Sequence, residues 1–396
     1  MRCFLPILSS PPSPFTCNSF GFFISTFILK QPYTMIVTWL TKSQKDGTID
    51  RSRATNSQDV PTGKEDMSMQ ALVYQAPWKM TVEDVPRPTA GPGEVIIDVK
   101  AVGICGSDVH GYTGSTGRRN PPMIMGHEFS GVISAIGPGV TQAKEGDAVV
   151  ATPIFPFNGI GQRKVLGVFS TPGAYAEQVV VHESMLLPKP SHVTWRQAAM
   201  CEPLAVALHA ISRTPIPLMG TVVIVGAGTI GLLAMMGARL AGAGKIIMSD
   251  MSAHRLEMAE ELGADMVINI NNQDPVQTIL DYTNGKGVDV AIEAVGISAA
   301  VQQAHKVTRN GGHITWIGNS ARMIELDMQE VVARELSICG TYGFQSEFPL
   351  ALDAIASGRI NVEPMMEKIA PLAEGPALID GLAAGKLDLV KAILEL

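Results

Sequence analysis

The hydrophobic pattern of the chain changes character near Pro190. Before that residue, from Gln70 to about Val150, apolar residues occur in short runs separated by Gly-Pro and Pro-Gly pairs. Short apolar runs between turn-forming residues predict β-strands joined by tight turns. The clearest runs are residues 94–104, 129–137 and 147–155. We therefore expect a compact, irregular β domain in which helices are scarce.

Beyond Pro190 the pattern indicates helices that alternate with buried strands. Residues 195–211 carry apolar side chains at helical spacing. The strand-like runs that follow are apolar on both faces, which is typical of a parallel sheet covered by helices. We expect strands at 221–227, 245–250, 266–270, 288–295 and 311–318, with helices at 230–242, 253–263 and 298–308. The alternation predicts an α/β fold with a doubly wound parallel sheet.

These patterns divide the chain into four segments. A chain of 396 residues exceeds a comfortable single core, so two domains are expected. We expect residues 67–204 to form the β-rich domain and residues 205–335 to form the domain with the parallel sheet. Residues 336–396 return to a mixed pattern and are expected to rejoin the first domain.

Residues 1–66 differ from the rest, because they are rich in Ser, Pro, Thr and Phe and lack sustained periodicity. We interpret them as a disordered tail or a mis-assigned start, with Met67 or Met69 as the beginning. The apolar patch at 15–29 is too short and too polar for a membrane span. A cleaved signal peptide is the alternative, because Arg2 precedes an apolar run, although the prolines there suit such a segment poorly.

Composition narrows the class of partner. The formal net charge is −7, aromatic residues make up 6%, and no long Lys/Arg run occurs. A basic stripe or stacking platform for nucleic acid cannot be assembled from such a chain, so we expect a small-molecule partner and neither nucleic acid nor membrane. The five cysteines are scattered and include no C-x-x-C pair. They argue against a disulfide scaffold and favour a reducing compartment, the cytoplasm.

A glycine motif points to a dinucleotide. Gly226, Gly228 and Gly231 form G-x-G-x-x-G directly after an expected strand and before an expected helix. In that context the glycines allow a tight turn, close approach of backbone amides to a pyrophosphate, and close helix–strand packing. Asp250 closes the next strand, where a carboxylate binds the adenosine ribose and repels a 2′-phosphate, so NAD is preferred over NADP. The alternatives are a structural turn for the glycines and a strand-end cap for Asp250.

Three residues in the β-rich part and after it have the chemistry of a catalytic zinc site. Cys105, His127 and Glu202 offer a thiolate, an imidazole and a carboxylate, which leaves a fourth position open. Such a zinc stabilises the alkoxide that an alcohol must form before it loses hydride. Glu128 reaches the same metal only if the backbone turns beside His127, so we treat it as a supporting or exchanging ligand. Cys201 is the alternative to Glu202.

Three strings carry a family resemblance. GICGSDVH (103–110) and GHEFSG (126–131) resemble the catalytic-zinc signatures of zinc-dependent medium-chain alcohol dehydrogenases, and CEPLAV (201–206) resembles the sorbitol, xylitol and iditol dehydrogenase branch. The resemblance runs from about Gln70 to Leu396. It implies a GroES-like catalytic domain beside a Rossmann domain, and oxidation of a secondary alcohol, such as a polyol, with NAD. We also expect a homo-oligomer, either a dimer or a tetramer.

The resemblance also implies roles for single residues. It makes Cys105, His127 and Glu202 the zinc ligands with Glu128 and Asp108 beside them, Ser107 the partner of the substrate hydroxyl, and His110 part of the proton path. The implied NAD-binding residues are Gly226, Gly228, Ile230, Gly231, Asp250, Arg255, Ile317, Gly318 and Asn319. Arg334 and Glu335 are expected near the sugar alcohol. Their alternative is an ion pair at the domain junction, and that of Ser107 is a turn cap.

The sequence departs from the family in two places. Many relatives carry a structural zinc on four cysteines, whereas residues 151–178 contain no cysteine, so only the catalytic zinc is expected. Gly111 also stands where several polyol dehydrogenases have an aromatic residue, and Tyr112 is next to it. A butanediol-type or threonine-type dehydrogenase is therefore the alternative substrate class. A zinc-free quinone reductase-like or non-catalytic relative is a more distant one, because it would lack the Cys-His-Glu set.

Overall fold

The computed structural model describes residues 68–155 and 164–396. All of these lie within one unit, Gly63–Leu396. The expected tail, residues 1–66, and part of the cysteine-free segment, residues 156–163, lie outside the described residues. No helix in the described ranges is long and apolar enough to cross a membrane.

The β-rich part contains a three-stranded and a seven-stranded sheet. Apolar side chains from both surround one core, which includes Leu72, Ile97, Phe129 and Tyr175. The smaller sheet has the order β2-β1-β4; the larger has the order β15-β16-β3-β5-β6-β8, with β7 also paired to β3. The bounds are β1 Ser68–Ala76, β2 Lys79–Pro86, β3 Glu94–Gly103, β4 Met123–Ile124, β5 Glu128–Ile136, β6 Ala148–Ala151, β7 Gln178–His182, β8 Leu186–Pro188, β15 Met366–Pro371 and β16 Lys391–Glu395.

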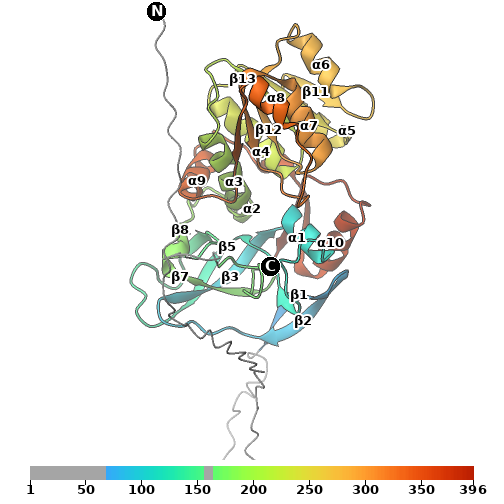
Figure 1. Ribbon diagram of the computed structural model, residues 1–396. Coiled ribbons are helices and arrows are strands. Elements are labelled where there is room, and N and C mark those ends of the chain that lie inside the picture. Colours follow the sequence, from blue (N-terminus) through green and yellow to red (C-terminus); the bar gives the residue numbers. More distant parts are fainter. Residues whose placement is uncertain (1–67, 156–163) are drawn as a thin grey trace, which may run out of the picture. The chain divides into compact units, whose positions relative to one another are not determined.

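A six-stranded parallel sheet forms the second part, with the order β11-β10-β9-β12-β13-β14. Its strands are β9 Thr221–Val225, β10 Lys245–Asp250, β11 Met266–Asn269, β12 Val288–Glu293, β13 Thr308–Trp316 and β14 Ser337–Gly340. The predicted parallel sheet is thus confirmed. Alternate residues of β9 enter different cores, since Val222 and Ile224 pack with one set of helices and Val223 and Val225 with another. Helices therefore cover both faces, as a doubly wound fold requires (Figure 1).

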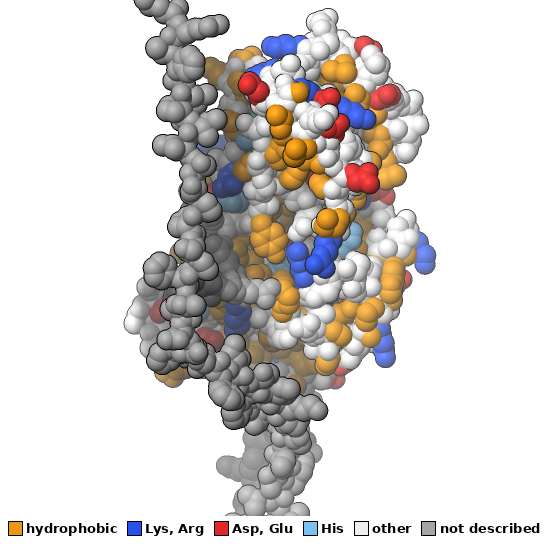
Figure 2. All heavy atoms as spheres, viewed as in Figure 1, with side chains coloured by type: hydrophobic (Ala, Val, Ile, Leu, Met, Phe, Trp, Pro, Cys, Tyr) orange, Lys and Arg blue, Asp and Glu red, His pale blue; other side chains and the backbone are white. Residues whose placement is uncertain are grey.

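The helices and short 3-10 turns complete the chain. Their bounds are α1 Gly106–Tyr112, α2 Trp195–Ala199, α3 Cys201–Ser212, α4 Thr229–Leu240, α5 Ala253–Glu261, α6 Pro275–Tyr282, α7 Ser298–Val307, α8 Met328–Ala333, α9 Glu347–Ala356, α10 Gly375–Ala383, η1 Glu183–Met185, η2 Glu363–Met365 and η3 Leu372–Glu374. On the face shown in Figure 2, acidic, basic and apolar side chains are interspersed, and no continuous basic stripe is present there.

The helix expected at residues 195–211 is two helices. Thr194 begins α2 with a capping box to Gln197, and the helix ends at Ala199. The break at Met200 has a physical cause in Pro203, which has no N–H for the carbonyl of residue 199 and whose ring crowds that carbonyl. Pro203 is tolerated because it falls in the first turn of the new helix, α3. The break places Glu202 in that first turn as well.

The boundary expected at residue 335 lies one strand too early. β14 follows it and pairs in parallel with β13, so the six-stranded sheet continues to Gly340. The last strands then return to the other sheet, where β16 pairs with β3 and β15 pairs with β16. Pattern reading missed β14 because the strand has only four residues, and their burial is only partial at the sheet edge.

A buried polar link joins α9 to α3. Nδ1 of His209 lies 3.0 Å from Oε1 of Glu347, and Ser212 Oγ donates to the same oxygen at 3.1 Å. The other oxygen, Oε2, accepts the backbone N–H groups of Gln345 and Ser346. Burial alone would raise the pKa of Glu347, but the bond to His209 and the N–H of Gln345 lower it to about 2.

This link predicts acid-sensitive stability. A carboxylate whose pKa is lower in the folded state stabilises the protein above its ordinary pKa of 4.5, and the contribution is lost as the pH falls through 2. Urea unfolding should show that Glu347→Gln costs about 2 kcal/mol near neutrality, with a difference from wild type that shrinks at acid pH. Glu374→Gln, at an exposed ion pair, is the control. A difference independent of pH would contradict the assignment.

Candidate active site

Three of the expected zinc ligands meet at the junction of β3, α1 and β5. One ligand atom from each of Cys105, His127 and Glu128 lies within 4.8 Å of the others, and both His127 and Glu128 are buried. Cys105 is the N-cap of α1, where its Sγ accepts the N–H of Ser107 at 3.4 Å. The cluster therefore forms where a strand ends and a short helix begins.

The backbone turns beside His127, as a shared site for two consecutive residues requires. Gly126 has a φ of +94°, in the left-handed region that favours glycine. A Cβ on Gly126 would lie 2.5 Å from the ring of Tyr175. Gly103 also leaves room, because a Cβ there would meet the Glu128 carboxylate at 2.2 Å. Glycines on both sides thus allow the two side chains to reach one place.

Asp108 supports the cluster from the protein interior. Its carboxylate is fully buried, and it accepts bonds from Arg119 at 2.7 Å and from the Tyr175 hydroxyl at 2.9 Å. His127 Nδ1 faces the same carboxylate at 3.4 Å, which leaves Nε2 for the cluster. Burial would raise the pKa of Asp108, but His127 and Arg119 hold it well below its usual range. The imidazole is thereby oriented by a permanent negative charge.

A buried lysine approaches the cluster from the end of the chain. Lys391 is 2% exposed, and its Nζ donates to Glu128 Oε2 at 2.7 Å and to the carbonyl of Ile104 at 3.1 Å. The other oxygen of Glu128 is buried without a hydrogen-bond partner. Glu128 therefore has one oxygen fixed by Lys391 and one free.

Glu202 lies outside the 4.8 Å group but belongs to the same charged environment. It is 9% exposed; burial raises its pKa to about 7, with His127 and Lys391 opposing and Glu128 and Asp108 adding to the rise. Its role as a ligand stays a prediction. Cys201 instead packs in the apolar core around α3, where burial raises the pKa of its thiol. That placement favours Glu202 over Cys201.

Ser107 and His110 both lie on α1, three residues apart and hence on one side of the helix. Both are exposed, and Ser107 Oγ lies 3.5 Å from Arg119 Nη2. Tyr112 is buried and bonds through its hydroxyl to Asp380 of α10 at 3.0 Å. Helices α1 and α10 accordingly lie side by side (Figure 1), and Tyr112 connects them.

The glycine motif forms the turn between β9 and α4. Gly226 has a φ of +103°, and a Cβ on Gly231 would lie 1.8 Å from the Gly226 carbonyl oxygen. Gly228 caps α4, and Ile230 follows half-buried in the first turn. No side chain is compatible with the Gly231 position, because the helix packs directly against the strand there. This is the geometry that brings backbone amides to a pyrophosphate.

Asp250 ends β10 beside this turn. Its Oδ2 accepts the N–H of Ala227 at 2.7 Å and its Oδ1 that of Ser252 at 2.9 Å. Asp250 therefore does cap backbone N–H groups at the end of the strand, which was the alternative to ribose binding. Each carboxylate oxygen nevertheless keeps a second lone pair for a ribose hydroxyl. Arg255 lies close by, with Nη1 3.8 Å from where a Cβ of Gly228 would stand.

Two further loops at the carboxyl edge of the sheet touch each other. A Cβ on Gly318 would lie 2.1 Å from the Gly296 nitrogen, so the backbones are in direct contact. Glu293 accepts the N–H groups of Val295 and Gly296 with its side chain, and its carbonyl accepts those of Ile317 and Gly318. The predicted residues Ile317, Gly318 and Asn319 are thus held at the same edge as the glycine turn.

Arg334 and Glu335 are not at this site, and the prediction that they lie near the substrate is wrong. They connect α8 to β14, and the chain between a helix and the next parallel strand lies at the amino edge of the sheet. Arg334 donates to the carbonyls of His305 and Thr308 and pairs with Glu330 at 3.2 Å. Thr308 begins β13, whose other end leads to Ile317. Glu335 is exposed.

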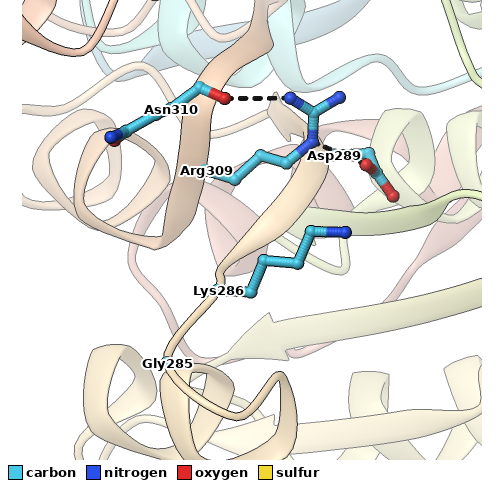
Figure 3. A pocket seen from close by; sticks show the side chains of 5 residues that line it. All are labelled: Gly285, Lys286, Asp289, Arg309 and Asn310. Carbon is cyan, nitrogen blue, oxygen red and sulfur yellow. Dashed lines mark hydrogen bonds and ion pairs between the residues drawn. The ribbon is translucent and has the colours of Figure 1, made fainter.

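A surface pocket at that amino edge is lined by Gly285, Lys286, Asp289, Arg309 and Asn310 (Figure 3). Arg309 turns toward its neighbours there, with bonds to Asp289 at 2.7 Å and to the Asn310 carbonyl at 2.9 Å. The pocket is separated from the glycine turn by the length of the strands. It contributes nothing to the cluster around Cys105.

Comparison with known proteins assigns the family. Residues 91–191 match the alcohol dehydrogenase GroES-like domain, and residues 229–357 match the zinc-binding dehydrogenase domain. Sorbitol dehydrogenase of Bacillus subtilis (strain 168) is 34% identical over 314 residues, which cover 76% of this chain and 89% of that protein.

The chain belongs to the zinc-dependent medium-chain alcohol dehydrogenases, in their polyol dehydrogenase-like branch.

Solved structures of this family agree in fold. That of 2R,3R-butanediol dehydrogenase from Bacillus subtilis has a TM-score of 0.77 and 31% identity, covering 83% of this chain and 100% of that one. A putative zinc-binding dehydrogenase from Sinorhizobium meliloti 1021, bound to NADP, has a TM-score of 0.78 and 29% identity, with 83% and 99% coverage. This chain is accordingly an alcohol or polyol oxidoreductase that uses zinc and a nicotinamide cofactor.

The residues of this dehydrogenase fit both groups. A thiolate, an imidazole and carboxylates are the donors zinc prefers, and the negative charges of Asp108 and Cys105 oppose the effect of burial to raise the pKa of His127. A site this negative favours a cation. The glycine turn and the amides around it fit a dinucleotide.

Pattern reading missed Lys391, Arg119 and Tyr175. Lys391 had a detectable signal, since it is a single charge inside the otherwise apolar run of residues 389–394, and a lysine at a buried strand position needs a partner. Arg119 and Tyr175 had none, because nothing local relates them to Asp108.

Removing Lys391 should destabilise the dehydrogenase strongly. In zinc-stripped protein, Lys391→Met leaves Glu128 as an unpaired buried charge, so denaturant unfolding should show a loss of about 3–5 kcal/mol, partly recovered when Glu128→Gln is added. Lys368→Met, at an exposed pair with Glu374, is the control and should cost at most about 1 kcal/mol. Equal losses in the two lysine variants would contradict the assigned pair.

Proposed function

We propose that this dehydrogenase oxidises a secondary alcohol, a polyol such as sorbitol or xylitol, to the ketone with transfer of hydride to NAD. The observation that carries the proposal is the cluster of Cys105, His127 and Glu128 within 4.8 Å, in a buried and negatively charged site. Glu202, in the first turn of α3, faces the same charges.

Cys105, His127 and Glu202 would hold the zinc, which, when bound, lowers the pKa of the alcohol hydroxyl. Asp108 fixes the imidazole of His127, and Lys391 fixes one oxygen of Glu128. Ser107 accepts the substrate proton, and His110, one helical turn further, passes it to solvent. The exposure of both side chains on α1 supports this proton path.

NAD is the proposed cofactor rather than NADP. Gly226, Gly228 and Gly231 would bring amides to the pyrophosphate, with Ile230 beside them, and Asp250 would bind the adenosine ribose. The loop at Ile317, Gly318 and Asn319 would lie beside the nicotinamide. The support is the position of all these residues at the carboxyl edge of one sheet.

The polyol assignment now rests on the relatives rather than on Arg334 and Glu335. The sorbitol dehydrogenase favours a polyol, whereas the butanediol dehydrogenase structure favours a small diol as the second candidate. A threonine-type activity uses the same zinc and cofactor machinery. The three substrate classes differ in the pocket beside the zinc, so turnover separates them.

We also propose a homo-oligomer, a dimer or tetramer, in the cytoplasm, with a small-molecule substrate and without nucleic acid or membrane as partner. β14 is an edge strand of the six-stranded sheet, and nearby Met328, Val332 and Tyr342 are exposed apolar residues, which supports self-association. Cys105, Cys201 and Cys339 are free thiols, which supports a reducing compartment.

The proposed reaction is tested by offering NAD with sorbitol, xylitol, 2,3-butanediol or threonine and following reduced cofactor by absorbance, with zinc measured by mass spectrometry on the same sample. We expect about one zinc per chain, because the sequence allows one site. A polyol should give the highest kcat/KM. Preferred turnover of butanediol or threonine would replace the polyol assignment with that substrate.

Glu202→Ala tests the third ligand. It should lower both zinc content and kcat, the latter about 100-fold or more, because an open three-ligand site loses its geometry. Glu145→Ala, at an exposed residue of the same catalytic part, is the control. Full zinc content and turnover in Glu202→Ala would remove Glu202 from the site, and cofactor binding without zinc or turnover in the wild type would contradict the mechanism.

A further inference from the structure

A short segment near the end of the chain lies across the glycine turn and the start of α5. Val390 is fixed from two sides, because its N–H donates to Glu367 Oε2 at 2.6 Å and its carbonyl accepts the Thr229 hydroxyl at 2.5 Å. Thr229 is the first residue of α4. His254, in the first turn of α5, bonds to the other oxygen of Glu367. Residues 388–390 are therefore held in place beside Asp250.

Asp388, in this segment, contacts two residues of the adenosine side. Its Oδ1 lies 2.7 Å from Nε of Arg255, and its Oδ2 accepts the hydroxyl of Ser252 at 2.5 Å. Ser252 in turn caps α5 by accepting the N–H of Arg255, and its own N–H binds Asp250. Asp388 and Asp250 thus both contact the same serine, one through its hydroxyl and one through its backbone N–H.

Arg255 is the cation of this corner whose position suits a phosphate on the ribose. In dinucleotide folds the residue at the end of the second strand reads the ribose 2′ position, where a carboxylate binds the diol and a nearby arginine binds a 2′-phosphate. Here both residue types are present, so Asp250 alone does not decide between the cofactors. What decides is whether the guanidinium of Arg255 is free.

We propose that Asp388 is a specificity-determining residue for the cofactor: it engages Arg255 and adds a second negative charge at the ribose, so that a 2′-phosphate is rejected. A dianionic phosphate would meet two carboxylates and an arginine whose charge is already paired. This inference rests on the proposed NAD site. It goes beyond that site because it assigns discrimination to the C-terminal segment rather than to the Rossmann domain.

Asp388 is a cleaner test of discrimination than Asp250. Asp250 accepts two backbone N–H groups, so its substitution would distort the glycine turn. Among the described residues, the Asp388 carboxylate accepts a hydrogen bond from Ser252 and forms an ion pair with Arg255, and both contacts are with side chains. In Asp388→Asn the amide oxygen still accepts the Ser252 hydroxyl, so charge is removed with the local tie retained. Asp388→Glu keeps the charge.

The experiment measures binding of adenosine 5′-monophosphate and adenosine 2′,5′-bisphosphate by calorimetry on the full chain. These ligands probe the adenosine end alone and require neither zinc turnover nor an alcohol. Wild type and Asp388→Glu should prefer the monophosphate. Asp388→Asn should shift the ratio of the two dissociation constants toward the bisphosphate by about twofold to fivefold, the scale of one partly exposed charge pair.

Two further variants complete the design. Glu330→Gln removes a carboxylate paired with an arginine at the opposite edge of the sheet, and it should leave the ratio unchanged. Adding Arg255→Met to Asp388→Asn should make the shift smaller, because the freed guanidinium is one of its two sources, and the lost negative charge of Asp388 is the other. The ratio of kcat/KM values for NADP and NAD should follow the same order across the variants.

The outcomes separate the two proposals. If the wild type binds neither nucleotide, or prefers the bisphosphate, the NAD site itself is wrong and the role of Asp388 with it. If the wild type prefers the monophosphate and Asp388→Asn keeps the same ratio, only the role of Asp388 is overturned. A shift of undiminished size without Arg255 also overturns it.

Discussion

The buried ion pair between Lys391 and Glu128 is the contact through which the two parts of the site are joined. Two opposite charges enclosed in protein are stable only while both remain in place, because either one alone pays a large desolvation penalty. Lys391 begins β16, and the three residues before it lie along the cofactor turn. The position of the metal cluster is therefore fixed relative to the nucleotide turn by one short stretch of backbone. In a hydride transfer between two bound groups, that relative position determines the reacting geometry.

The charged side chains around the cluster favour a bound cation. Two permanent cations lie there, Arg119 and Lys391, and each is bonded to one carboxylate. The acidic groups around them are Asp108, Glu128, Glu202 and the Cys105 thiol. Burial raises the pKa of Glu202 to about 7 in the absence of metal, which indicates that its ionised form lacks a partner. A zinc ion would supply that partner, and the fixed bonds to Asp108 and Lys391 would keep the neighbouring groups from competing for it.

The two edges of the parallel sheet carry different kinds of residue: those expected to bind the cofactor lie at the carboxyl edge, and those with a structural role lie at the amino edge. Loops that follow the strands carry the glycine turn, Asp250 and the touching pair Gly296 and Gly318, whereas connections that precede strands carry Arg334 and Glu335. An arginine beside a glutamate in sequence looks like a recognition pair. Arg334, however, lies between α8 and β14, where it donates to backbone carbonyls at the amino edge. The substrate contacts are consequently left to other residues, and the cofactor selection that we propose would take place where Asp388 pairs with Arg255.

The sequence alone determined whatever depends on local pattern. Strand and helix alternation predicted the parallel sheet, the context of Gly226, Gly228 and Gly231 predicted the dinucleotide turn, and the family resemblance of the strings around Cys105 and His127 indicated the metal. These signals are local, because a tight turn or a buried strand constrains residues that are neighbours in sequence. Tertiary structure alone decided which distant residues form ion pairs: Lys391 with Glu128, Arg119 with Asp108, and Asp388 with Arg255. It also corrected Arg334 and Glu335 and extended the sheet to β14. The physical reason is that a charge selects its partner by distance in the folded chain, and no spacing along the sequence encodes that distance.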